Sequence, residues 1–266
     1  MIRYLALVMA FLILVSVPAL AQRETADDSA YSYARIPRAP LRWTIDTPTA
    51  GMLPRGSFDL DIKTFTGGGI QTVLGIGLMN RFSVGLAYGA SRVLSDTTPN
   101  WGPRLEFQLR YRLLEEGHGF PGIAVGFNSQ GYGPYDDSLK RYQIKSQGFY
   151  VAFSTNFQIY SNNAGLHFGA NYSLENDRDS DPSIFVGFNA DLGNDMLFLS
   201  EYDFALNDNT RYSVYGKGRG FFNMGLTWYL TDGLSLELDL KNLLRNRAGA
   251  GAIDREARLV YTEFFY

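Results

Sequence analysis

Charged residues that could do chemistry in this chain fall in four extended segments, where they alternate with apolar residues. Because successive side chains of a strand point to opposite faces, the charges of each segment share one face. These residues are Asp59, Asp61, Lys63, Arg104, Glu106, Arg110, Arg112, Glu201, Asp203, Glu237, Asp239 and Lys241. Gathered around a narrow space, they would orient a charged or sugar-like solute. Alternatively, they would pair with one another and fill that space, since charges in a low-dielectric surrounding must be paired.

Catalytic chemistry has little support. The chain has no Cys, which excludes disulfides, thiolate metal sites and Cys nucleophiles. Of its two histidines, His118 falls in an expected turn and His167 on a polar strand face, with Asn171 and Ser173 on the same face. These residue types occur in outer-membrane hydrolases, but their spacing does not place a nucleophile beside a base. We therefore predict a protein without catalytic residues, cofactors or a His-based metal site.

Two further ligand classes are not supported either. The segment 175–181 carries four alternate carboxylates that could hold Ca²⁺, at Glu175, Asp177, Asp179 and Asp181. It lacks the distal Glu of a complete calcium loop, so we interpret it as a solvated outer loop. The formal net charge is −3 and no basic run is present, which argues against nucleic-acid binding.

The segments that carry the charges have the period of a β-strand. In the stretch from Arg104 to Leu113, five polar residues alternate strictly with Leu and aromatic residues. Eleven further segments of similar length between Ser57 and Tyr266 alternate in the same way. Roughly ten residues is the length that a tilted transmembrane strand needs. The pattern predicts an all-β fold, a transmembrane antiparallel β-barrel of about twelve strands and of the bacterial outer-membrane type.

A soluble β-sandwich is the main rival to this interpretation, and two observations favour the barrel. The polar faces are rich in Gly, Ala, Ser and Asn, as a crowded lumen requires, whereas a sandwich would expose scattered Lys and Glu. The connections alternate between short and long in nine cases out of eleven, which matches the short periplasmic turns and long outer loops of such barrels. We therefore expect the apolar faces to contact outer-membrane lipid.

The ends of the chain divide it into three parts. Residues 1–21 combine Arg3, an apolar run and Ala19-Leu20-Ala21, which is typical of a secretory signal peptide, although an N-terminal membrane anchor is the alternative. We predict a periplasmic N-terminal segment over residues 22–56 and the barrel over 57–266. The final strand ends in Phe264-Phe265-Tyr266 and resembles the terminal strand of outer-membrane barrels, which predicts recognition by the barrel-assembly machinery.

Two segments resemble the YjbH-like outer-membrane family, which is associated with bacterial exopolysaccharide. The first is Asp46-Thr47-Pro48-Thr49-Ala50 with Pro54-x-Gly56, and the second runs from Phe107 through Glu115-Glu116 to Phe120-Pro121-Gly122 and Gly126. The family members are longer and often lipid-anchored through a Cys that this chain lacks. The resemblance implies an outer-membrane barrel with a role in polysaccharide secretion and supplies no catalytic residues.

Together these observations lead to two functional hypotheses. The first is a non-enzymatic pore or accessory factor for exopolysaccharide or small polar solutes, in which acidic strands face a basic row of Arg104, Arg110 and Arg112. The second is a structural or interaction barrel, whose lumen is filled by ion pairs and whose outer loops contact partners. An outer-membrane hydrolase ranks third.

Overall fold

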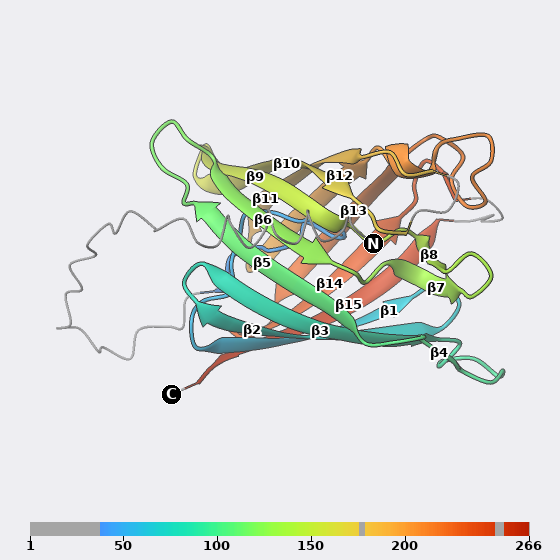
Figure 1. Cartoon of the computed structure of the whole chain (residues 1–266). Coiled ribbons are helices and arrows are strands. Elements are labelled where there is room, and N and C mark those ends of the chain that lie inside the picture. Colours follow the sequence, from blue (N-terminus) through green and yellow to red (C-terminus); the bar gives the residue numbers. More distant parts are fainter. Residues whose placement is uncertain (1–37, 176–178, 248–252, 266) are drawn as a thin grey trace. The chain divides into compact units, whose positions relative to one another are not determined.

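The computed structural model describes residues 38–175, 179–247 and 253–265, and twelve of its strands form one barrel (Figure 1). These strands are β1 (Ser57–Phe65), β2 (Gly69–Met79), β3 (Phe82–Ser91), β5 (Glu106–Leu114), β6 (Gly122–Asn128), β9 (Gly148–Ile159), β10 (Asn162–Tyr172), β11 (Ser183–Gly193), β12 (Met196–Asp203), β13 (Phe221–Tyr229), β14 (Leu234–Lys241) and β15 (Asp254–Phe264). A short strand β4 (Asn100–Trp101) pairs with the end of β3. The hairpin β7 (Tyr132–Asp136) and β8 (Arg141–Ile144) and the single-turn helix η1 (Leu206–Asp208) lie in the loops.

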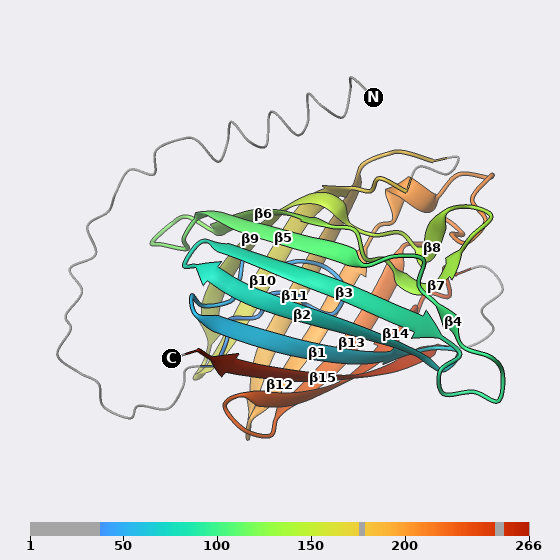
Figure 2. The same cartoon turned by 60° about the horizontal axis from the view of Figure 1, so that its bottom comes forward.

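Each barrel strand pairs antiparallel with its neighbours, and the first strand closes the ring against the last (Figure 2). In this closing pair, Asp61 lies opposite Val260 and Lys63 opposite Arg258. On the other side of β1, Asp61 lies opposite Val73 of β2. The prediction of a twelve-stranded antiparallel barrel is confirmed.

The two faces of the wall differ as the alternation predicts. Large apolar side chains such as Leu86, Leu166 and Leu238 are exposed on the outside of the wall. Ala87, which follows Leu86 on the same strand, is buried on the inside. Near the rim, Tyr88 stacks on Trp101, an aromatic pair of the kind found at membrane interfaces. A closed barrel pairs the backbone groups of all its strands, and its apolar outer belt makes it a barrel of the outer-membrane type. Over the described residues, no helix has the length and hydropathy to cross a membrane.

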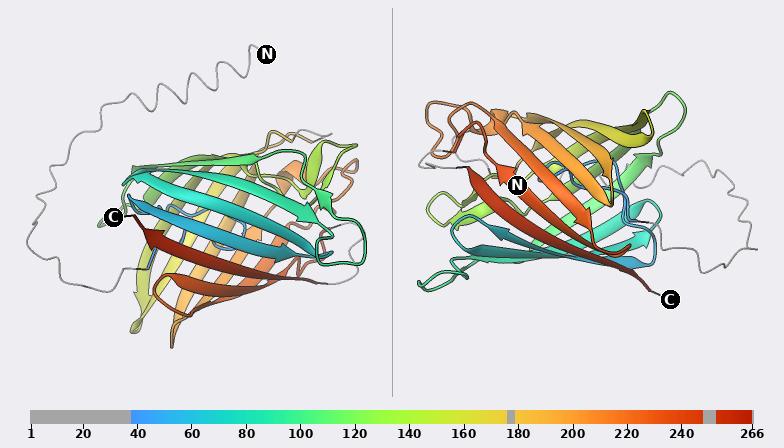
Figure 3. Two further views of the ribbon diagram at one scale, coloured as in Figure 1. Left: turned by 90° about the horizontal axis from the view of Figure 1, so that it is seen from below. Right: turned by 180° about the vertical axis from the view of Figure 1, so that it is seen from behind.

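The connections define the two ends of the barrel. Short turns join β2 to β3, β9 to β10, β11 to β12 and β13 to β14, and the turn after β11 contains Asn194 and Asp195, both with positive φ. The start of β1 and the end of β15 lie at this same end, which is the periplasmic end in barrels of this type (Figure 3). The long connections, including the hairpin of β7 and β8, lie at the outer end.

Residues 41–53 lie inside the barrel, and we call them the plug. Thr44 to Ala50 are all buried, as are Met52 and Leu53, and the blue trace of this segment runs within the ring of strands (Figures 1 and 3). This corrects the prediction of a periplasmic segment over residues 22–56, because residues 41–53 occupy the lumen. Residues before 38, including the predicted signal peptide, lie outside the described residues.

Candidate functional site: a plugged lumen

The plug is a tight hairpin-like loop whose tip points to the wall. Thr44 N donates to Thr47 O (2.9 Å) and Thr49 N donates to Arg42 O (3.0 Å), with a bridge between Trp43 and Pro48. The Thr49 hydroxyl donates to Leu41 O and so ties the two arms together. These internal bonds satisfy part of the plug's backbone, and the remaining polar groups must find partners on the barrel wall.

Glu201 of β12 supplies most of these partners at the tip. Its Oε2 accepts hydrogen bonds from the backbone N–H groups of Ile45 (3.0 Å), Asp46 (2.9 Å) and Thr47 (2.9 Å), and from the Thr47 hydroxyl (2.8 Å). Asn223 Nδ2 donates to Oε1 (2.8 Å). Three consecutive N–H groups aimed at one carboxylate form an anion-binding nest. The wall thus binds three consecutive backbone N–H groups of the plug through one carboxylate.

The side chain of Asp46 extends from the tip of the plug toward two lysines of the wall. Its Oδ1 lies 2.9 Å from Lys63 Nζ and its Oδ2 contacts Lys241 Nζ, while Lys241 also pairs with Glu256 (3.1 Å). Burial raises the pKa of the Asp46 carboxyl, but Lys241 and Lys63 outweigh burial and lower it to about 2. Asp46 is therefore ionised at neutral pH and holds the plug to both sides of the β14–β15–β1 wall.

Tyr132 links this cluster to the outer loops. The hydroxyl of Tyr132 in β7 donates to Asp46 O (2.9 Å), and its ring lies 4.8 Å from Lys63 Nζ and 4.9 Å from Lys241 Nζ. The loop hairpin thus reaches the plug from the outer end, and the two segments are in contact there.

Arg110 and Ser154 hold the other arm of the plug. Arg110 Nη1 of β5 donates to Thr49 O and Gly51 O, both at 2.9 Å, and the guanidinium lies 4.8 Å from the Trp43 ring. The N–H of Ala50 donates to Ser154 Oγ of β9 (2.8 Å). The plug therefore makes polar contacts with β1, β5, β9, β12 and β14.

The predicted acidic wall is largely paired. Asp59 accepts a bond from Arg42 of the plug (2.7 Å), and Asp61 accepts two from Arg258 (2.5 and 2.8 Å). Arg258 also contacts Glu237 at 3.3 Å. Asp239 differs, because both of its buried carboxylate oxygens lack a hydrogen-bond partner among the described residues.

The predicted basic row of Arg104, Arg110 and Arg112 does not form. Arg110 is buried and holds the plug, whereas Arg104 precedes β5, is exposed and pairs with the buried Glu106 (3.0 Å). Arg112 lies toward the periplasmic end, where it bonds Asn80 O (3.3 Å) and Glu115 (2.8 Å). Asp203 lies inside and accepts from Ser183 Oγ (3.1 Å) and Ala205 N (2.8 Å).

Several residues of the site were not predicted from the sequence. Asp46 and Tyr132 lie outside the alternating strands, so periodicity gave no reason to place them in the lumen. Arg258 and Glu256 carried such a signal, because they alternate with Ala257 and Leu259 on the last strand. Pairing of β15 with β1 brings both into the charged cluster.

His167 does not approach the Asn171 and Ser173 side chains that sequence analysis grouped with it. Its Nδ1 lies 2.7 Å from Ser154 Oγ and its Nε2 lies 2.7 Å from Asn189 Oδ1, and both partners lie on adjacent strands. The Ser–His–Asn order has the connectivity of a nucleophile, a base and an orienting amide. Among the described residues, no group of three or more His, Asp or Glu side chains is placed to hold a metal ion.

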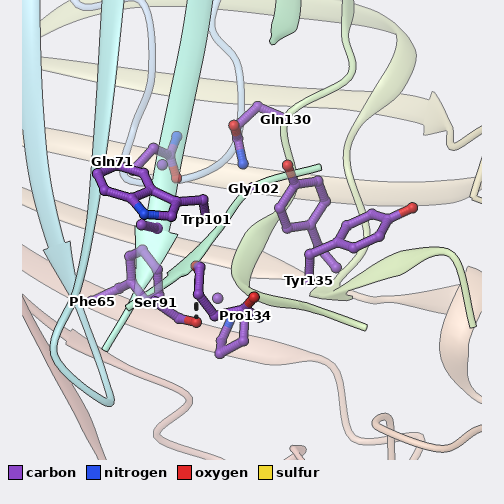
Figure 4. A pocket seen from close by; sticks show the side chains of 13 residues that line it. Phe65, Gln71, Ser91, Trp101, Gly102, Gln130, Pro134 and Tyr135 are labelled. Atoms are coloured by element: carbon purple, nitrogen blue, oxygen red, sulfur yellow. Dashed lines mark hydrogen bonds between the residues drawn. The ribbon is translucent and has the colours of Figure 1, made fainter. Parts of the chain in front are cut away.

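Small cavities remain beside the plug, and four of them follow one another along the barrel. One lies at the periplasmic end between Arg38 and the turn at Gly233, and it shares Arg42 and Trp43 with a second cavity. The second shares Asp61, Val73 and Gln108 with a third at mid-height. The third shares Gln71 with a pocket at the outer mouth, where Gln71, Gln130 and Tyr135 surround the opening (Figure 4).

The comparisons with known proteins concern the fold. No family model matches the chain, and no curated protein matches it. Solved structures similar to it include the KdgM porin (11% identity, TM-score 0.46, covering 79% of this chain and 99% of that chain). Another is an outer membrane channel from Pseudomonas putida F1 (14%, 0.42, 80% and 97%). A third is Omp33 of Acinetobacter baumannii (10%, 0.43, 79% and 97%). The likeness is one of barrel architecture. Identities of 10–14% carry no information about function beyond the fold.

Proposed function

We propose that this protein is a non-enzymatic outer-membrane channel for small polar solutes, and that the plug closes its lumen at rest. The proposal rests on the polar contacts that hold the plug in the lumen, which we call the seat of the plug. Glu201, Arg110 and the Lys63–Lys241 pair hold it through hydrogen bonds and ion pairs, all of which water can replace when the plug moves. The lumen that a displaced plug leaves behind has a polar, charged wall suited to hydrated solutes.

A permanent filler would have a different composition. Apolar side chains of similar volume stabilise a protein interior as well as buried ion pairs do, or better. The plug also has apolar contacts, since Ile45 packs against Leu197 and Leu199, Trp43 packs against the cluster around Tyr150, and Met52 and Leu53 are buried. Its tip is nevertheless held by charged wall residues, namely Glu201, Lys63 and Lys241. The polar seat therefore favours a plug that leaves and returns. The YjbH-like resemblance adds exopolysaccharide as a candidate solute, which the same channel would serve in its open state.

A reversible covalent lock tests the proposal. A Cβ built at Gly122 of β6 lies 3.4 Å from Ala50 Cβ in the plug, which is close to the separation across a disulfide. Because the chain has no Cys, the double variant Ala50→Cys with Gly122→Cys forms one defined cross-link. We expect the oxidised protein to block glucose-driven swelling of liposomes and the large conductance of the open channel, and the reduced protein to permit both.

Controls separate the lock from other effects of the substitutions. The single variants should be insensitive to oxidation. A second lock, Thr44→Cys with Gly187→Cys, joins the plug to β11 on another part of the wall, since the Cβ atoms there are 3.3 Å apart. If the reduced, folded protein admits no solute at any voltage, the pore proposal is rejected and the structural barrel is favoured.

A hydrolase is the second candidate, favoured by the Ser154–His167–Asn189 constellation. Ala50 of the plug covers Ser154 Oγ, so a nucleophilic serine would act only after the plug moves. A fluorophosphonate probe should then label the reduced lock variant and not Ser154→Ala. Absence of labelling in a preparation with open channels would eliminate this candidate.

A further inference from the structure

We propose that the four cavities beside the plug form one water-filled path through the barrel, and that this path conducts small monovalent cations while the plug is seated. The proposal rests on the proposed channel function but does not require the plug to move. It concerns the space between the plug and the wall, bounded by β13, β14 and β15 near the periplasmic end and by β1, β2, β3 and β5 further out.

The first step is the continuity of the path. Successive cavities share lining residues from the periplasmic turn near Gly233 to the outer mouth near Tyr135. Val73 of β2 lies at the junction of the two middle cavities, and Gln71 at the junction with the outer mouth. Each cavity has room for at least one water molecule. A sugar ring does not fit beside the seated plug.

The second step is the presence of buried polar atoms with no partner along this path. Asp59 and Asp61 are 3% and 7% exposed, and the Oδ1 atom of each lacks a hydrogen-bond partner among the described residues. Arg110 Nη2, 5% exposed, likewise lacks one. All three residues line the second cavity. Buried polar atoms of this kind are normally satisfied by ordered water, so the cavity is wet.

The third step is the sign of the charge that the path favours. The cations along it are engaged by carboxylates, since Arg42 binds Asp59, Arg258 binds Asp61 and Lys63 binds Asp46. Arg110 Nη1 donates hydrogen bonds to two carbonyls of the plug, and the guanidinium lies against the Trp43 ring. The free oxygens of Asp59 and Asp61 outnumber the free guanidinium nitrogen. A hydrated cation therefore finds more ligands there than an anion does.

The experiment uses the full chain with the Ala50–Gly122 lock oxidised, in planar bilayers under a KCl gradient. We expect a small steady conductance whose reversal potential favours K⁺. Val73→Trp should abolish it, because the indole fills the junction between the two middle cavities. Leu74→Trp is the matched control, since Leu74 is the next residue on the same strand but faces lipid and is 42% exposed.

Each outcome bears on the path separately from the plug. No conductance in the oxidised protein, with conductance restored on reduction, would overturn the path and leave the plug-gated channel standing. A leak that prefers Cl⁻, or that Val73→Trp leaves unchanged, would also overturn it. The isosteric variant Asp61→Asn should shift the reversal potential toward zero, and a heat-shift gel establishes that each variant is folded.

Discussion

Replacing Glu201 by Gln should release the plug without changing the shape of the side chain. Oε2 of Glu201 accepts four hydrogen bonds from plug residues, at 2.8–3.0 Å. A hydrogen bond to a charged group contributes about 1 kcal/mol more than one between neutral groups. Because the four bonds share one oxygen, their losses do not add. We expect a total loss of about 2 kcal/mol, which is roughly a 30-fold rise in the ratio of displaced to seated plug.

The open probability of single channels in planar bilayers measures this ratio directly. Asp203→Asn is the matched control, since Asp203 lies two residues further along β12 and bonds Ser183 and Ala205 rather than the plug. Equal open probabilities in Glu201→Gln and the wild-type protein, with both folded by gel mobility, would refute the role of Glu201 as the seat of the plug.

Three further predictions concern the Asp46 ion pairs, the charged wall and the outer apolar belt. The pKa of Asp46 is lowered from 3.8 to about 2 by the two lysines, so its roughly 2 kcal/mol contribution to seating the plug is present above pH 4 and is lost as pH falls through about 2. Asp46→Asn should thus raise the open probability at pH 7, and an unchanged open probability in this variant would contradict the assignment. Lys241→Met leaves Asp46 and Glu256 with Lys63 alone and should cost about 3 kcal/mol of stability, seen as a lower temperature of the gel shift, while the exposed Lys140→Met should not. On the lipid face, Leu86→Arg at mid-strand should cost about 2–4 kcal/mol in refolding titrations with lipid vesicles and Met79→Arg at the strand end about 0–1 kcal/mol, and equal costs would argue against the assigned belt.

The strands could be predicted from the sequence because the membrane imposes a simple rule on them. A strand with lipid on one side and lumen on the other must alternate, and β3 does so from Phe82 to Tyr88. The antiparallel strands must also close on themselves, which makes the strand count even. Barrels of this type also have short periplasmic turns. These constraints act locally, residue by residue, so a single sequence displays them.

The plug could not be predicted in this way. Residues 41–53 have no periodicity, and their prolines and threonines indicate a turn without indicating where the turn lies. Their position depends on partners that are distant in the chain, such as Glu201, which lies 155 residues beyond Asp46. The same limit applies to Arg104, whose place before β5 depends on where pairing with β3 ends. Alternation identified the inward charges but not their partners.

The partners change what those charges imply. Before the plug is placed, acidic residues on β1, β12 and β14 and the arginine on β5 form opposed walls of an open pore. With the plug in place, Glu201 binds backbone N–H groups, Arg110 binds backbone carbonyls and Lys63 with Lys241 binds one aspartate. These four wall charges are complementary to particular groups of the plug rather than to one another, whereas Asp61 and Glu237 pair with Arg258 within the wall. Charges of both signs are therefore retained around a single loop, because either sign alone would leave half of its polar groups unsatisfied.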